Sequence, residues 1–151
     1  MPTHRPLQIL VATCTILVAL VFFVAGVQKL RVPDPTVTMI GRYIDSPQAV
    51  RAIGFMEIGL ATWMLSFRTP RLAGGAAALA LAGFSVLIAV ELQRNAPLPC
   101  GCLETRPGLE SPHAIRRGLW VSLGRNAFLI LCATSVAVLA TSDKPRASSE
   151  F

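Results

Sequence analysis

Long apolar runs separate the charged residues of this chain, and they limit the folds it can adopt. The first run, residues 7–30, carries no charged side chain before Lys29. Further runs cover residues 49–67, 72–92 and 119–140. Each has about the length that a helix needs to cross bilayer hydrocarbon, where the backbone must be hydrogen-bonded within the segment. The sequence therefore predicts an all-α fold, an integral membrane four-helix bundle.

The composition agrees with a membrane protein. Hydrophobic residues make up 53% of the 151 residues and charged residues 15%, whereas a soluble domain has about 25% charged residues. The formal net charge is +6, and the basic residues lie mainly between the apolar runs. This placement favours membrane lipid head groups as partners, and no basic stripe with interleaved aromatics indicates nucleic acid. We expect a single membrane domain over residues 1–151.

The connections between the apolar runs differ in length. The short turn "RTPR" joins the second run to the third, so these two helices are expected to be antiparallel neighbours. At the other end lie a proline-containing loop, residues 31–48, and a longer one, residues 93–118, called the thiol loop below. Residues 141–151 are polar and are predicted to form a flexible tail. The stretch "AGGAAALALAG" in the third run either allows close helix packing or simply favours a helix.

Two cysteines lie close together in the thiol loop. Cys100 and Cys102 are separated only by Gly101, which permits the backbone angles that a small disulfide ring needs. Such a ring is strained, and strained disulfides are more oxidising. Arg94 and Arg106 are near in sequence and would favour the reactive thiolate. The pattern indicates a redox centre, with a structural disulfide or two idle thiols as the alternatives.

The other cysteines and the histidines suggest no metal centre. Structural zinc usually has four protein ligands, and His113 is the only histidine near the thiol loop. Cys14 and Cys132 lie inside apolar runs, at similar depth from the opposite surface. Buried cysteine usually behaves as a small hydrophobic residue, and we expect that role for both.

Charged residues within the apolar runs gather at the thiol-loop end. Lys29 and Glu91 lie near the ends of their runs, while Glu57 and Arg125 lie about 10 Å further in at a rise of 1.5 Å per residue. An unpaired charge at that depth costs a few kcal/mol or more. We therefore expect Glu57 to pair with Arg125 or with Lys29. Such a pair either fixes helix register or belongs to an intramembrane polar site, with Asn126, that tunes the thiols or binds a quinone.

The distribution of positive charge does not decide which way the chain crosses the membrane. The two long loops and their helix ends carry more lysine and arginine than the side with the termini, which places the thiol loop in the cytoplasm. The density of positive charge is higher in the short segments on the side with the termini, which favours the opposite orientation. A redox role favours it too, because disulfides persist outside the cytoplasm. We expect a multi-pass protein of the bacterial inner membrane with its thiol loop on the extracytoplasmic side.

Four stretches occur in the order typical of one membrane protein family. "FVAGVQKLRVPD", "FMEIGLATWML", "PCGCLE" and "GRNAFLIL" resemble the MauE-like, DoxX-related four-helix proteins over about residues 20–132. That family has a Gly-x-x-Lys-Leu motif, an in-membrane Glu, a Cys-x-Cys-Phe-Gly loop and an Arg-Asn pair. The resemblance marks Gly26, Lys29, Leu30, Glu57, Cys100, Cys102, Arg125 and Asn126. Leu103 and Glu104 replace the family's Phe-Gly.

The resemblance implies extracytoplasmic thiol chemistry. MauE is linked to maturation of the disulfide-rich small subunit of methylamine dehydrogenase with a thioredoxin-like partner, and DoxX relatives to sulfur-compound oxidation. By analogy this chain would be a thiol–disulfide oxidoreductase in which Cys100 and Cys102 exchange with a thioredoxin-like or disulfide-bearing protein. No cofactor motif is recognisable, and a quinone is the cofactor that the polar site would suit. The alternative is a non-catalytic membrane subunit that stabilises a larger respiratory or dehydrogenase complex.

Overall fold

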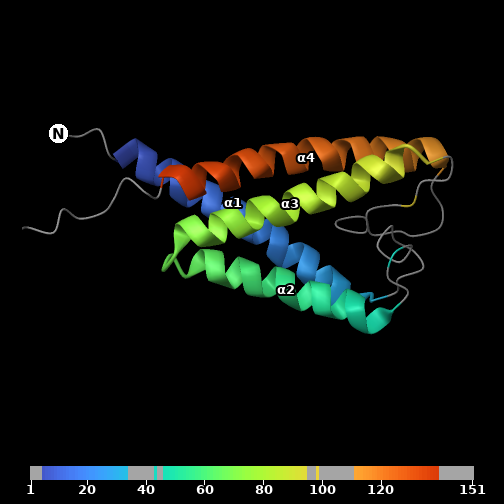
Figure 1. The fold of residues 1–151 in the computed structure, drawn as a ribbon, viewed down its shortest axis with the longest axis horizontal. Coiled ribbons are helices and arrows are strands. Elements are labelled where there is room, and N and C mark those ends of the chain that lie inside the picture. The colour runs from blue at the N-terminus through green and yellow to red at the C-terminus, as the bar shows by residue number, and fades with distance from the viewer. Residues whose placement is uncertain (1–4, 34–42, 44–45, 95–97, 99–110, 140–151) are drawn as a thin grey trace, which may run out of the picture.

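Four helices make up the part of the chain that the structure, a computed structural model, describes (Figure 1). The described residues are 5–33, 43, 46–94, 98 and 111–139. In chain order the helices are α1 (Arg5–Arg31), α2 (Pro47–Leu65), α3 (Pro70–Leu92) and α4 (Pro112–Leu139). No strand occurs within these ranges. The predicted all-α four-helix fold is confirmed, and the predicted tail lies outside the described residues.

Three of the four helices are long and apolar enough to cross a membrane. By length and composition these are Leu7–Arg31 of α1, Pro70–Leu92 of α3 and Pro112–Leu139 of α4. The chain is therefore a multi-pass membrane protein. Helix α2 is not among the three, because Arg51 and Glu57 interrupt its apolar stretch. Its crossing of the membrane stays a prediction.

Helix α2 begins two residues before the start of the predicted range of 49–67, and it ends two residues before the end of that range. At its start the Ser46 hydroxyl accepts the backbone N–H of the residue three positions on, at 3.4 Å, and Pro47 occupies the first turn. Both residues are typical of helix N-termini, since a hydroxyl satisfies a free N–H and proline has none to lose. The helix ends at Leu65, and Phe67 then has a φ of 51° in the turn to α3.

Helix α4 begins seven residues before the predicted start at Leu119. The Ser111 hydroxyl accepts the backbone N–H of Ala114 at 3.3 Å, which caps the helix, and the first two turns are rich in basic residues. The range of 93–118 predicted for the thiol loop is therefore wrong at its C-terminal end. The prediction relied on a run of apolar residues, whereas a capped first turn of a helix can be made of polar residues.

The helices are arranged as two closely packed pairs. Helix α1 packs mainly on α2, and α3 on α4, while α1 also contacts α4. Helices α2 and α3 share a tight turn but touch little, and they diverge away from it in Figure 1. A Cβ added to Gly74 on α3 would lie 2.8 Å from the backbone oxygen of Ala133 on α4. Small residues therefore do allow close packing at Gly74, which is one of the two alternatives predicted for the third run.

The buried side chains form two clusters. The larger draws on all four helices and contains Cys14 and Cys132, which are free and buried. This confirms their predicted burial as small hydrophobic residues. The smaller, called the loop-end cluster below, consists of Val50, Ile88 and Leu119 with partly buried neighbours.

Candidate functional site

Lys29 and Glu57 form a buried ion pair between α1 and α2. The Lys29 Nζ lies 2.8 Å from Oε1 and 2.9 Å from Oε2 of Glu57, and the two side chains are 5% and 6% exposed. The Phe84 ring of α3 lies beside the ammonium, with its centroid 5.6 Å from Nζ. Of the two predicted partners of Glu57, Lys29 is therefore confirmed. The Glu57–Arg125 pair is wrong, since no ion pair joins these two described residues.

Two glycines let the helices approach closely enough to form this pair. A Cβ added to Gly26 would lie 2.6 Å from the backbone oxygen of Gly54 and 3.2 Å from the Cβ of Glu57. A Cβ added to Gly54 would lie 2.9 Å from the backbone oxygen of Gly26 and 3.2 Å from the Cβ of Lys29. Each charged side chain thus starts over the glycine of the opposite helix. Leu30 borders the same contact, 3.4 Å from the position of a Gly54 Cβ.

Gly54 is a site residue that the sequence analysis missed. A signal for it exists, because Gly26 precedes Lys29 by three residues just as Gly54 precedes Glu57. Residues three apart share a helix face, so a glycine and a charge at this spacing indicate a close contact that leads into a polar pair. The repeat of this spacing with opposite charges on two helices is the pattern that predicts their partnership.

Asn126 and Arg125 occupy separate surroundings in α4. The Asn126 side chain is buried, and its Nδ2 donates to the Ser85 hydroxyl of α3 at 3.4 Å. Ser85 in turn donates to the backbone oxygen of Leu81 at 2.8 Å. The Nε of Arg125 is buried and has no hydrogen-bond partner among the described residues. The predicted single site is therefore divided: Asn126 joins α4 to α3, whereas Lys29 and Glu57 join α1 to α2.

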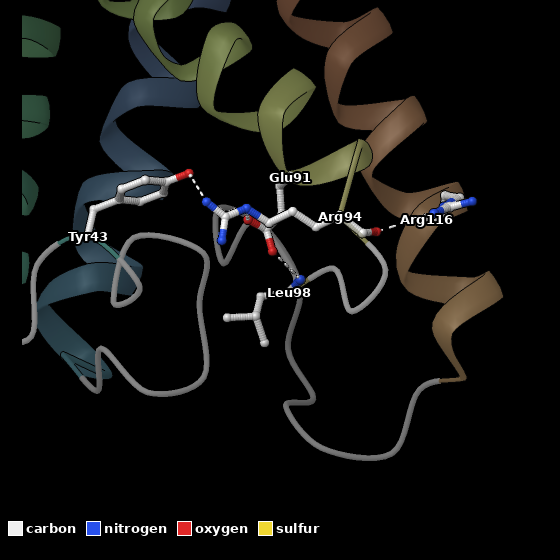
Figure 2. Close-up of polar contacts among 5 residues, drawn as sticks. All are labelled: Tyr43, Glu91, Arg94, Leu98 and Arg116. Atoms are coloured by element: carbon white, nitrogen blue, oxygen red, sulfur yellow. Dashed lines mark hydrogen bonds and ion pairs between the residues drawn. The ribbon is translucent and has the colours of Figure 1, made fainter.

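A second polar group lies where α3 ends (Figure 2). The Glu91 side chain is fully buried, and its Oε1 accepts the backbone N–H of Leu98 at 2.9 Å. Its Oε2 lies 3.6 Å from the Nε of Arg94. A buried carboxylate is costly unless hydrogen bonds or ion pairs replace its hydration, and these two groups serve that need.

Arg94 connects this group to two other parts of the chain. Its Nη2 donates to the Tyr43 hydroxyl at 3.3 Å, and its guanidinium lies 5.7 Å from the centroid of the Tyr43 ring. The Nη2 of Arg116, from the first turns of α4, donates to the backbone oxygen of Arg94 at 3.4 Å. Tyr43 and Arg116 were not predicted. No local pattern marks them, because their roles depend on which helix ends meet in the fold.

The thiols themselves lie outside the described residues. This holds for Cys100, Gly101 and Cys102 and for the two residues that depart from the family pattern, Leu103 and Glu104. Leu98, two residues before Cys100, is the nearest described residue on the N-terminal side. The redox role of the cysteines and the tuning role of the polar residues therefore stay predictions.

The chain matches a protein-family model. The model of the methylamine utilisation protein MauE family matches residues 7–140, which includes all four helices but for the first two residues of α1. No curated protein and no solved structure matches the chain. A relation to DoxX proteins stays a prediction.

Proposed function

Because this chain belongs to the methylamine utilisation protein MauE family, we propose that it is a membrane thiol–disulfide redox protein. Membership makes it a membrane protein involved in methylamine utilisation. The proposal adds that Cys100 and Cys102 carry the chemistry, and that the partner is a thioredoxin-like or disulfide-bearing protein. It also places the thiol loop on the extracytoplasmic side of a bacterial inner membrane, where disulfides persist.

The attachment of Leu98 to the bundle is the observation that carries the proposal. Leu98 packs against the loop-end cluster and donates its N–H to Glu91. Cys100 is two residues further on, and two residues of chain span at most about 7 Å. Arg94 and Arg116 lie at the same end, and positive charge near a thiol favours its thiolate. This arrangement supports reactive thiols at the membrane surface.

The proposed reaction is a two-step exchange between the chain and its partner. One thiolate of the Cys100–Cys102 pair attacks a sulfur of the partner's disulfide, whose S–S bond breaks as a mixed disulfide forms. The second thiolate then attacks the mixed disulfide. The chain loses two electrons and two protons and gains a disulfide, while the partner gains two thiols. Run in reverse, the same steps oxidise the partner, so the exchange needs no further reactant.

The Lys29–Glu57 pair has a structural role in this proposal. Lys29 directs two hydrogen bonds to one carboxylate and borders an aromatic ring, so both charges are already partnered. A quinone would have to compete with this pairing for Lys29. The proposed exchange proceeds without a quinone in the bundle, and electrons pass onward through the protein partner.

A redox titration of the full chain in lipid nanodiscs tests the proposal. After equilibration in glutathione buffers of stepped potential, free thiols are labelled with a maleimide that adds mass. We expect Cys100 and Cys102 to gain or lose two labels together, because an intramolecular disulfide forms and breaks as one unit. Cys100→Ser or Cys102→Ser should abolish this paired transition.

The buried cysteines provide the matched control. A chain with both Cys14→Ala and Cys132→Ala should titrate like the wild type, since neither residue takes part in the exchange. Thiols that do not change state at any potential would contradict the proposal. Normal methylamine-dependent growth of the Cys100→Ser/Cys102→Ser variant, with the protein held in a stable large complex, would favour the non-catalytic subunit instead.

A further inference from the structure

The buried carboxylate at the end of α3 has a partner in the segment that leads to the thiols. We infer that Glu91 is a positioning residue: by accepting the N–H of Leu98, it holds the start of the thiol-bearing segment against the end of the bundle. This inference rests on the proposed function, since it concerns the presentation of the same two cysteines.

The placement of Glu91 is unfavourable without such a partner. Its side chain is fully buried, and an ionised carboxylate loses its hydration there. It also belongs to the last turn of α3, where the helix dipole presents its negative end and disfavours an acidic side chain. Two of its contacts come from beyond the helix, from the N–H of Leu98 and the guanidinium of Arg94. Glu91 is therefore better suited to binding the segment after α3 than to stabilising α3 itself.

The sequence around Leu98 leaves one backbone donor for this contact. Leu98 stands between Pro97 and Pro99, and proline has no N–H. The N–H of Leu98 is thus the only backbone donor of the three residues, and it is the one that Glu91 binds at 2.9 Å. The Leu98 side chain is partly buried against the loop-end cluster. Backbone and side chain therefore hold this residue independently.

Arg94 extends the attachment to both neighbouring segments, as Figure 2 shows. It pairs with Glu91, donates to the Tyr43 hydroxyl and accepts a hydrogen bond from Arg116 through its backbone oxygen. The first long loop, the end of α3 and the start of α4 thus meet at one arginine. Because the segment is held at Leu98, two residues before Cys100, we expect the attachment to limit how freely the cysteines meet a reagent or partner.

Two substitutions of Glu91 separate its hydrogen bond from its charge. Glu91→Leu removes the acceptor, whereas Glu91→Gln keeps a carbonyl oxygen for Leu98. We measure hydrogen exchange in the 97–99 region, where only Leu98 has an amide hydrogen, and alkylation of Cys100 and Cys102 by a water-soluble maleimide. In Glu91→Leu we expect Leu98 to exchange about tenfold faster and the thiols to react about threefold faster. Glu91→Gln should stay within about twofold of the wild type.

Substitutions at Leu98 test the same hydrogen bond from the other side. Leu98→Pro removes the N–H, and Leu98→Ala removes the side chain but keeps the N–H. Alkylation should be faster in Leu98→Pro than in Leu98→Ala. Adding Glu91→Leu to Leu98→Pro should change the alkylation rate no further, because the N–H that Glu91 binds is already absent in Leu98→Pro. Circular dichroism and gel filtration confirm that each variant compared is folded.

The outcomes distinguish this inference from the proposed function. Unchanged Leu98 exchange and alkylation in folded Glu91→Leu would overturn the inference. Equal acceleration in folded Glu91→Gln and Glu91→Leu would overturn it too, because charge rather than the hydrogen bond would then be responsible. Wild-type thiols that never form a disulfide would contradict the redox function, yet faster Leu98 exchange in Glu91→Leu would still support the attachment.

Discussion

Lys29→Met is expected to lower the free energy of unfolding by about 3–5 kcal/mol. The change leaves the Glu57 carboxylate buried without the ammonium that now lies 2.8 Å from it. Methionine fills similar space, so the loss reports the missing charge rather than a cavity. Unfolding by sodium dodecyl sulfate in mixed micelles, monitored by far-ultraviolet circular dichroism, measures the difference.

A double substitution and an exposed control identify the cause of this loss. Lys29→Met combined with Glu57→Leu should recover most of the stability, because apolar residues often replace a buried ion pair without cost. Arg51→Met removes an exposed positive charge from α2 and should change stability by less than about 0.5 kcal/mol. The ion pair would not be the stabilising feature if Lys29→Met cost no more than Arg51→Met, or if the double variant were as unstable as the single one.

Gly26→Val is expected to lower the free energy of unfolding by at least about 2 kcal/mol. Its Cβ would lie 2.6 Å from the backbone oxygen of Gly54 and 2.7 Å from the Cγ1 of Ile58. A backbone atom cannot turn aside as a flexible side chain can, so α1 and α2 must separate. Separation also draws Lys29 away from Glu57. The same detergent titration measures the loss.

Gly59→Val on α2 is the matched control for this prediction, because no atom lies within 4 Å of the added Cβ. It should be tolerated, with a change of at most about 0.5 kcal/mol. Lys29→Met should also cost less in the Gly26→Val background than in the wild type, since the helices have already moved apart. Similar stabilities for Gly26→Val and Gly59→Val, or strict additivity with Lys29→Met, would argue against glycine contact as the basis of the pair.

The position of a residue along a membrane helix does not by itself identify its partner. Residue number gives depth, because each residue rises 1.5 Å, and depth correctly brought Lys29, Glu57 and Glu91 to one half of the bundle. Depth does not give rotation about the helix axis. Glu57 and Arg125 share a predicted depth, yet the side chain that meets Glu57 comes from α1. The Gly26–Gly54 contact decides this, because it sets how α1 and α2 face each other.

By itself the sequence determines that this chain forms four helices, at least three of them able to cross a membrane, since in lipid the polar backbone of an apolar segment has few other ways to satisfy its hydrogen bonds. It also determines that the charges gather at the thiol-loop end. The tertiary structure decided which of its two predicted partners Glu57 meets, and it supplied the partner of Glu91. Lys29 meets Glu57 through a close helix contact, and Glu91 meets the N–H of Leu98 beyond the end of its own helix. Such partnerships depend on helix rotation and on where a loop returns to the bundle, and both arise only when the helices pack.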